Sequence, residues 1–126
     1  MDKASKVRPE FIGQVLTCWD ETGRAMILVE DFTFRDSAGV FWDAPTGSIV
    51  DGASIPRLLW SALSSPFCGQ YRRASVLHDV ACQRKKRPHK EVHKMFYEAM
   101  LCDGVSVFKA KIMYRAVTLF GPKWKV

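Results

Sequence analysis

The feature that most constrains this fold is a change in hydrophobic pattern near Asp51. Before it, the runs "FIGQVLTCW" and "RAMILVEDFTF" are rich in the β-branched, aromatic and aliphatic residues that strands favour. The "DETG" between them has the acidic residues and the glycine that suit a turn. After Asp51, apolar residues recur at helical spacing. The sequence therefore predicts an α+β domain with strands first and helices last.

The strand-rich half is expected to form a small antiparallel sheet over residues 10–50. The first two runs predict a hairpin, and "DSAG" predicts a second turn before "VFWDAPTGSIV". Pro45 and Gly47 should interrupt or bulge this last run, because proline cannot donate a ladder hydrogen bond and glycine weakens a strand.

The second half predicts three helices, over about 71–84, 89–102 and 106–119. Pro88 and the "CDG" at 102–104 supply the breaks between them. Ahead of these helices, Ser54 is a good N-cap and Pro56 suits a first helical turn, so "RLLWSAL" is expected to form a short amphipathic segment.

A chain of 126 residues is long enough for one hydrophobic core. We expect a single domain over 1–126, with 1–9 flexible, 10–50 strand-rich and 51–126 helix-rich. The hydrophobic fraction of 48% and charged fraction of 25% are those of a folded globular protein. No membrane span is expected, because no apolar run approaches about 18 residues. The first residues also lack the apolar stretch of a secretory signal, so the expected location is the cytoplasm.

The net charge of +6 is concentrated in one block, "QRKKRPHK", at residues 83–90. Arg84, Lys85 and Lys86 are therefore candidate contacts to an anionic substrate, such as a polymer, or to an acidic protein partner. A solvated helix–helix loop is the alternative. Nucleic acid is a less favoured partner, because neither a groove-reading motif nor interleaved stacking aromatics accompany the charge.

The stretch "ASVLHDVAC" places His78 and Asp79 within the first of the three helices. His78 shares a stripe with small and apolar residues, and His93 lies on an apolar face of the next helix, so both are expected to point inward. In a hairpin that turns near Lys86, the two histidines stand at nearly equal height. His78, Asp79 and His93 are therefore candidate ligands for one divalent metal ion, zinc or manganese, that could activate water.

The alternative is a packing role, in which each histidine is hydrogen-bonded within the core. A buried carboxylate needs a partner, and Arg72, Arg73 or Arg115 could pair with Asp79 without any metal.

The box "DGASIP" offers further candidates at the junction of the two halves. Ser54 is explained by helix capping, whereas Asp51 has no such duty and is a candidate functional carboxylate. A Ser54–His78–Asp51 triad lacks a nucleophile elbow, and a Cys68–His78 pair lacks a recognisable signature.

Four segments, "DGASIPRLLW", "YRRASVLHDVAC", "VHKMFYEAML" and "YRAVTLFGPKW", resemble the bacterial and phage family known as domain of unknown function 1353. Asp51, Ser54 and Pro56 match its first box, and the His78-Asp79 pair matches its second. Phe96 matches the third box, and the resemblance runs from about residue 47 to 124. This chain departs at His93, where the family usually has aspartate. The resemblance implies a small phage or prophage protein, in the host cytoplasm or in the virion.

Two functional hypotheses follow. In the first, the protein is a metal-dependent hydrolase acting on an anionic polymer such as peptidoglycan or nucleic acid. His78, Asp79 and His93 hold the metal, and Asp51 or Asp79 is the general base. Ser54 and the basic residues 84–86 contact the substrate. In the second, the protein is a non-catalytic module, associated with the virion or tail or binding a host factor, and the His-Asp pair is a buried packing network.

Overall fold

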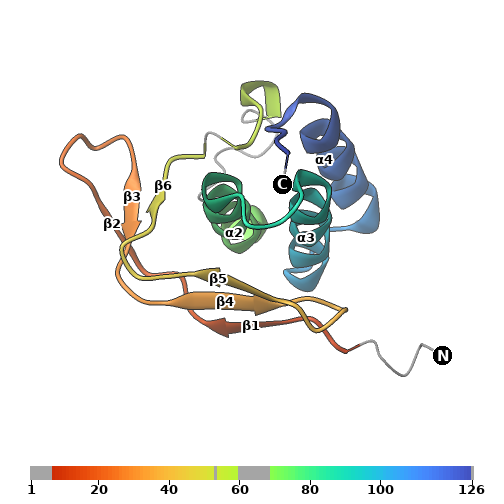
Figure 1. Ribbon diagram of the computed structural model, residues 1–126, viewed down its shortest axis with the longest axis horizontal. Coiled ribbons are helices and arrows are strands. Elements are labelled where there is room, and N and C mark those ends of the chain that lie inside the picture. The colour runs from red at the N-terminus through yellow and green to blue at the C-terminus, as the bar shows by residue number, and fades with distance from the viewer. Residues whose placement is uncertain (1–6, 53, 60–68, 126) are drawn as a thin grey trace.

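A computed structural model describes residues 7–52, 54–59 and 69–125. Within these residues, six strands in two antiparallel sheets precede three α-helices, which confirms the predicted α+β class (Figure 1). The strands are β1 (Glu10–Gly13), β2 (Thr17–Trp19), β3 (Met26–Leu28), β4 (Phe32–Arg35), β5 (Phe41–Ala44) and β6 (Ile49–Val50). The helices are α2 (Arg72–Arg84), α3 (His89–Cys102) and α4 (Val107–Phe120), preceded by 3-10 turns η2 (Arg57–Leu59) and η3 (Gly69–Tyr71).

The strands form two three-stranded sheets, β1-β4-β5 and β2-β3-β6, where the sequence predicted one. Each of the first two predicted strands is divided in two. The first forms β1 and β2, and the second forms β3 and β4. Gly13 ends β1 with a positive φ of 86°, and a Cβ built there would lie 3.0 Å from the carbonyl oxygen of Asp31. The chain therefore bends where two backbones approach closely, which hydrophobic alternation does not reveal.

The predicted turns are present. The "DETG" turn joins β2 to β3, and the "DSAG" turn joins β4 to β5. Pro45 and Gly47 separate β5 from β6, as expected from the missing donor of proline.

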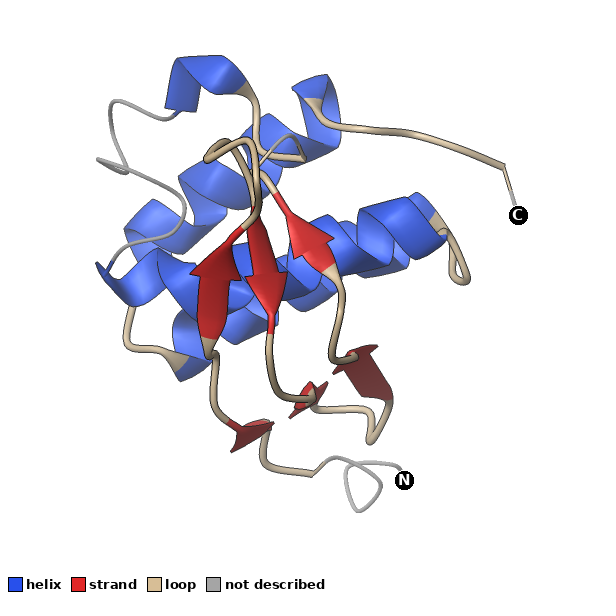
Figure 2. Ribbon diagram, turned by 90° about the vertical axis from the view of Figure 1, so that its left-hand side faces the viewer, coloured by secondary structure: helices blue, strands red, loops and turns tan. Residues whose placement is uncertain are grey.

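The core lies between sheet β1-β4-β5 and the helices. Phe34 and Trp42 are paired across β4 and β5, and both are buried on the helical side of that sheet. Leu77 from α2 and Phe96 from α3 belong to the same cluster. Sheet β2-β3-β6 stands to one side, in front of the helices when the molecule is viewed from the left of Figure 1 (Figure 2).

The three helices begin and end within one residue of the predicted bounds. Helix α3 lies between α2 and α4 (Figure 1). Lys85 ends α2 with a left-handed φ of 54°, which turns the chain toward α3 within four residues. The predicted segment "RLLWSAL" begins with η2, and its remainder lies outside the described residues. Among the described helices, none is long and apolar enough to cross a membrane.

Candidate functional site

Asp79 fixes helix α2 to the loop that follows β6. Its side chain is 2% exposed, and its two oxygens are divided between neighbouring groups of that loop. Oδ2 accepts hydrogen bonds from the backbone N–H groups of Asp51 (2.8 Å) and Gly52 (3.0 Å). Oδ1 lies 3.1 Å from the N–H of Ser54 and 2.6 Å from its hydroxyl oxygen. The carboxyl therefore satisfies backbone donors that burial would otherwise leave without partners.

The partners of Asp79 differ from those suggested by sequence. The expectation that an arginine pairs with this carboxyl is not met by either neighbour on the helix. Arg73 pairs with Asp103, and Arg72 donates to the backbone oxygen of Val15. The partners of the carboxyl are backbone N–H groups of the loop instead. The periodicity of the helix cannot predict such partners.

Ser54 joins Asp79 to the two histidines. Its Oγ is 2.9 Å from His78 Nδ1, and His78 Nε2 is 2.8 Å from His93 Nδ1. His93 Nε2 is 3.1 Å from the carbonyl oxygen of Pro122. Both histidines are fully buried, His78 on α2 and His93 on α3, and their rings are tilted by 35° with centroids 5.1 Å apart. We call this set, Asp79, Ser54, His78, His93 and the Pro122 carbonyl, the buried line.

The hydrogens available to the buried line can be counted. It contains four contacts, and each requires one hydrogen. With an ionised carboxylate, the serine hydroxyl and two neutral imidazoles supply three hydrogens, since a neutral imidazole has one N–H. The Ser54 hydroxyl donates to Asp79 Oδ1, so one of the remaining three contacts lacks a hydrogen. One further proton, on either imidazole, would fill all four contacts.

Burial acts on the titrating groups of the buried line in opposite directions. It raises the pKa of the Asp79 carboxyl, although hydrogen bonds from Ser54 and the loop N–H groups oppose this shift. Burial, reinforced by the charge of His93, lowers the pKa of His78 to about 3. Burial also lowers the pKa of His93. Burial therefore favours the neutral form of both imidazoles.

The three predicted metal ligands do not point toward one common position. His78 and His93 present nitrogens to each other, whereas the Asp79 oxygens face the loop. Two nitrogens bound to one tetrahedral zinc ion lie about 3.3 Å apart, so an ion between the histidines requires them to separate. Among the described residues, no group of three His, Cys, Asp or Glu side chains is arranged to hold a metal ion.

A cavity of about 570 Å³ adjoins the buried line. Ser54 and Asp79 form part of its wall, and the side chain of Asp51 lies at the same wall. Lys85 contributes a positive charge from the end of α2. The other lining residues are Ile49, Cys82, Gln83 and Pro122. A ligand in this cavity would therefore reach one edge of the buried line without entering the core.

The other sequence candidates occupy different positions. Arg84 and Lys86 line a second cavity, apart from Lys85, so the three predicted substrate contacts are divided between two sites. Cys68 lies outside the described residues, while the Cys82 sulfur is 3.8 Å from both ring nitrogens of His78. Burial raises the pKa of the Cys82 thiol to about 12, so this cysteine stays protonated.

Sequence reasoning missed two links. It assigned Ser54 to capping or substrate contact, whereas the hydroxyl bridges an acid and a base. It also missed the Pro122 carbonyl as the end of the buried line. The Gly-Pro in the closing "FGPKW" stretch marks the end of the last helix, but no local pattern shows where the chain goes afterwards.

The fold and the buried line together define a small α+β domain with a serine–histidine–histidine–aspartate network at the junction of sheet and helices. The chain belongs to the family described as Protein of unknown function (DUF1353), whose model matches residues 26–117. This match confirms the resemblance carried by the sequence boxes.

Two curated bacterial relatives come from Sinorhizobium fredii (strain NBRC 101917 / NGR234). Uncharacterized protein y4jT is 48% identical over 97 residues, which is 77% of this chain and 29% of the relative. Uncharacterized protein y4iH is 44% identical over 98 residues, 78% of this chain and 41% of the relative. The chain thus spans less than half the length of each. No solved structure matches it.

Proposed function

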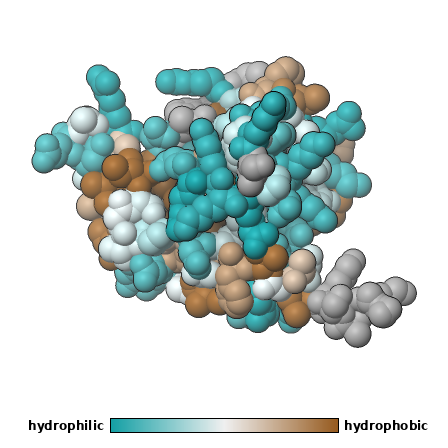
Figure 3. Space-filling view, in the orientation of Figure 1, coloured by the Kyte–Doolittle hydropathy of each residue, from teal (hydrophilic) through white to brown (hydrophobic). Residues whose placement is uncertain are grey.

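We propose that this domain is a binding module for an anionic partner, received by the basic turn, residues 84–90 between α2 and α3. The observation that carries the proposal is that side-chain and backbone contacts hold this turn in place. A loop whose charges serve only solubility does not need such contacts. Hydrophilic residues gather over the middle of the face in Figure 3, which has the orientation in which the α2–α3 connection of Figure 1 faces the viewer.

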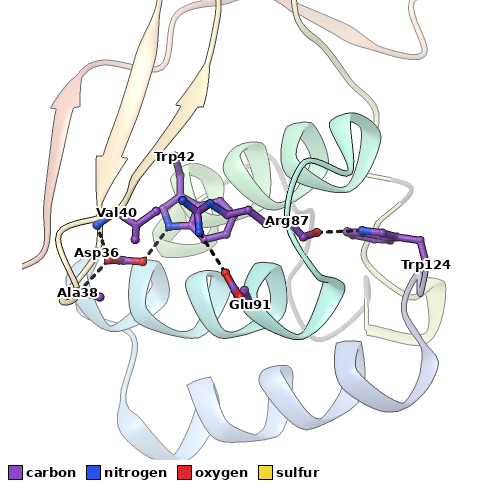
Figure 4. Close-up of polar contacts among 7 residues, drawn as sticks. All are labelled: Asp36, Ala38, Val40, Trp42, Arg87, Glu91 and Trp124. Carbon is purple, nitrogen blue, oxygen red and sulfur yellow. Dashed lines mark hydrogen bonds and ion pairs between the residues drawn. The ribbon is translucent and has the colours of Figure 1, made fainter. Parts of the chain in front are cut away.

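Three tethers hold Arg87 at the centre of the turn (Figure 4). Its guanidinium lies 5.4 Å from the ring centre of Trp42 and forms an ion pair with Glu91 at 3.1 Å. Its carbonyl oxygen accepts a hydrogen bond of 2.9 Å from the indole N–H of Trp124. Arg84 adds a fourth tether by donating to the carbonyl oxygen of Asp43 at 3.3 Å. A turn fixed before binding loses less conformational entropy when a partner binds.

The buried line supports this surface from beneath. Asp79 and His78 fix α2 against the loop at 51–54, and His93 fixes α3 against the C-terminal segment. The basic turn connects these two helices, so its geometry depends on theirs. In this proposal the His-Asp pair is a packing network, and the partner is an anionic polymer or an acidic face of a virion or host protein.

The test is a comparison of two double variants, Lys85→Gln with Lys86→Gln in the turn, and Lys109→Gln with Lys111→Gln in α4. Both remove two exposed positive charges. Binding to purified peptidoglycan is measured by co-sedimentation, and binding to a DNA oligonucleotide by fluorescence anisotropy. Affinity for the binding polymer should fall by about tenfold in the turn variant only. Equal loss in both variants, or binding of neither polymer by the wild type, contradicts the proposal for these partners.

A hydrolase is the second candidate, favoured by the cavity that Asp51, Ser54 and Asp79 line together. In this candidate a zinc or manganese ion is held by His78, Asp79 and His93, Asp51 or Asp79 is the general base, and Ser54 with residues 84–86 contacts the substrate. Elemental analysis of untagged protein, beside His78→Ala and His93→Ala, tests it. Near-stoichiometric metal that both variants lose supports the hydrolase, whereas none after incubation with zinc and manganese contradicts the metal site.

A phage or prophage origin, with a location in the host cytoplasm or the virion, is part of the same proposal. Its support is the match of the sequence boxes to a family that includes bacterial and phage proteins. Mass spectrometry of purified virions, beside the soluble fraction of the host cell, tests the location.

A further inference from the structure

A second cavity, of about 130 Å³, lies between β5 and the basic turn. Leu77 and Ala81 from α2 and Val92 from α3 provide apolar walls. Phe41 and Trp42 from β5 provide aromatic walls. This cavity is separate from the one beside Ser54 and Asp79, with which it shares no lining residue. It is therefore a distinct candidate binding site.

The volume of this cavity limits what can enter it. An apolar cavity of about 150 Å³ in another protein holds one benzene molecule. One aromatic ring or one branched aliphatic group is thus the largest apolar unit that fits. The ring of Phe41 is 56% exposed, so the cavity is reached past a large apolar side chain that a ligand would cover.

The charges around the cavity are predominantly positive. Arg84, Lys86 and Arg87 all line it, and Asp43 is the single acidic residue in the described part of its lining. The Asp43 carboxylate accepts a hydrogen bond from the Thr33 hydroxyl on the sheet. Arg87 is paired with Glu91, whereas no ion pair of Arg84 or Lys86 is found among the described residues. Lys86 is therefore available to an anionic group at the mouth, and Arg84 has further N–H donors beside the one that bonds the Asp43 carbonyl.

The cavity walls are held in place before any ligand arrives (Figure 4). The indole N–H of Trp42 donates to Asp36 Oδ2 at 2.9 Å. Asp36 Oδ1 in turn accepts the N–H groups of Ala38 and Val40, both at 2.9 Å. The guanidinium of Arg87 lies over the same indole ring. Aromatic and cationic walls are thus fixed relative to each other, which favours a ligand that has both an apolar and an anionic part.

We propose that this cavity binds a small ligand with one aromatic or branched aliphatic group beside one carboxylate or phosphate group. The apolar group lies between Trp42 and Ala81, and the anion contacts Arg84 and Lys86. The proposal rests on the proposed function, because it uses the basic turn as the binding surface, and it names the chemistry that the turn recognises.

The experiment compares three probes by isothermal titration calorimetry with the full chain: phenyl phosphate, phenol and inorganic phosphate. Phenyl phosphate should bind saturably and at least about tenfold more tightly than either of the others, because only it uses both parts of the site. Phenyl phosphate binding no tighter than inorganic phosphate overturns the proposal.

Variants locate the binding. Ala81→Leu fills the cavity and should abolish phenyl phosphate binding, whereas Ala116→Leu, at a half-buried alanine of α4, should leave it unchanged. Arg84→Gln should weaken binding by about tenfold, and Lys111→Gln is its matched charge control. If Ala81→Leu does not fold, Phe41→Ala replaces it and should weaken binding because it removes one wall. If Arg84→Gln and the cavity variant (Ala81→Leu or Phe41→Ala) both bind phenyl phosphate with the affinity of the wild type, the proposal is overturned.

The two proposals fail separately. If phenyl phosphate does not bind while the turn variant still loses polymer affinity, the cavity proposal is wrong and the anionic-partner proposal stands. If phenyl phosphate binds as described but neither polymer does, the cavity proposal stands and the polymer partners are wrong.

Discussion

His78 and His93 share a hydrogen bond of 2.8 Å between Nε2 and Nδ1, although neither ring contacts solvent. Two buried imidazoles can be joined in this way only if one nitrogen carries a hydrogen and the other does not. The remaining nitrogens are committed as well, to the Ser54 hydroxyl and to the Pro122 carbonyl. The pair therefore connects Ser54 to the C-terminal segment through continuous hydrogen bonds, and its behaviour can be tested by changing each end.

Replacement of Asp79 should destabilise the fold strongly. In Asp79→Asn, one of the two side-chain positions becomes an NH₂ group, which cannot accept from the loop N–H groups or from Ser54 as the carboxyl does. We expect a loss of about 2–4 kcal/mol in the free energy of unfolding, measured by urea denaturation. Glu91→Gln, which breaks an exposed i,i+4 ion pair, should change it by less than about 0.5 kcal/mol. Equal effects of the two variants would contradict the role of Asp79.

Acid should destabilise the protein through its buried histidines. Their pKa values are lowered in the folded state, that of His78 to about 3 from 6.5, so the unfolded chain binds protons first as the pH falls. Stability from His78 is thus present above pH 6.5 and is lost as the pH falls toward 3. This one residue accounts for about 2 kcal/mol between pH 6.5 and 4.5.

Asp79 acts in the opposite direction, because its raised pKa lets the folded state bind a proton before the unfolded chain does. Its stabilising contribution grows as the pH falls through that raised pKa. Urea denaturation of wild type and His78→Gln from pH 7 to 4.5 separates the two groups. The variant should have a shallower pH dependence than the wild type. A parallel pair of curves would argue that His78 does not remain neutral in the fold.

The substitution His93→Asp should reverse the behaviour of His78. A carboxylate at this position accepts a hydrogen bond from the His78 ring and favours its protonated form. The pKa of His78 should therefore rise well above about 3. Titration of the His78 ring by NMR measures this shift, and His89→Asp is a control at a neighbouring helix position. An unchanged His78 pKa in His93→Asp would mean that the two side chains no longer meet.

Loss of the indole N–H at residue 124 should loosen the basic turn without unfolding the core. Trp124→Phe keeps an aromatic ring but removes the donor to the Arg87 carbonyl. We expect a stability loss of about 1 kcal/mol and faster amide hydrogen exchange at residues 85–87. Tyr114→Phe in α4 is a control that should leave exchange in the turn unchanged. If the amides of the turn exchange as slowly in Trp124→Phe as in the wild type, the C-terminal segment does not hold the turn in place.

The helices were predictable because their signals are local. Pro88, the "CDG" break and the 3.6-residue pattern all lie within the segments that they delimit, and the meeting of His78 and His93 follows from two helices joined by a short turn. The partners of Asp79 could not be predicted in this way. They include the backbone amides of Asp51, Gly52 and Ser54, more than twenty positions away, and no side-chain pattern records where a backbone N–H points.

The division of the sheet has a similar cause. The two segments interpreted as long strands extend across residues 14–16 and 29–31, where the chain bends instead. Arg87 illustrates the limit for the surface. Its charge was visible in the basic block, but its contacts come from Trp42 on a strand, Glu91 one helical turn away and Trp124 beyond the last helix.

The length of chain between the members of the buried line also bears on how the protein folds. Asp51 and Asp79 are separated by 28 residues, and His93 and Pro122 by 29. Closure of long loops is entropically unfavourable until many contacts form together. We therefore expect the buried line to form late in folding. Defects in it should accelerate unfolding far more than they slow folding, so the line sets the lifetime of the native state rather than the speed at which it is reached.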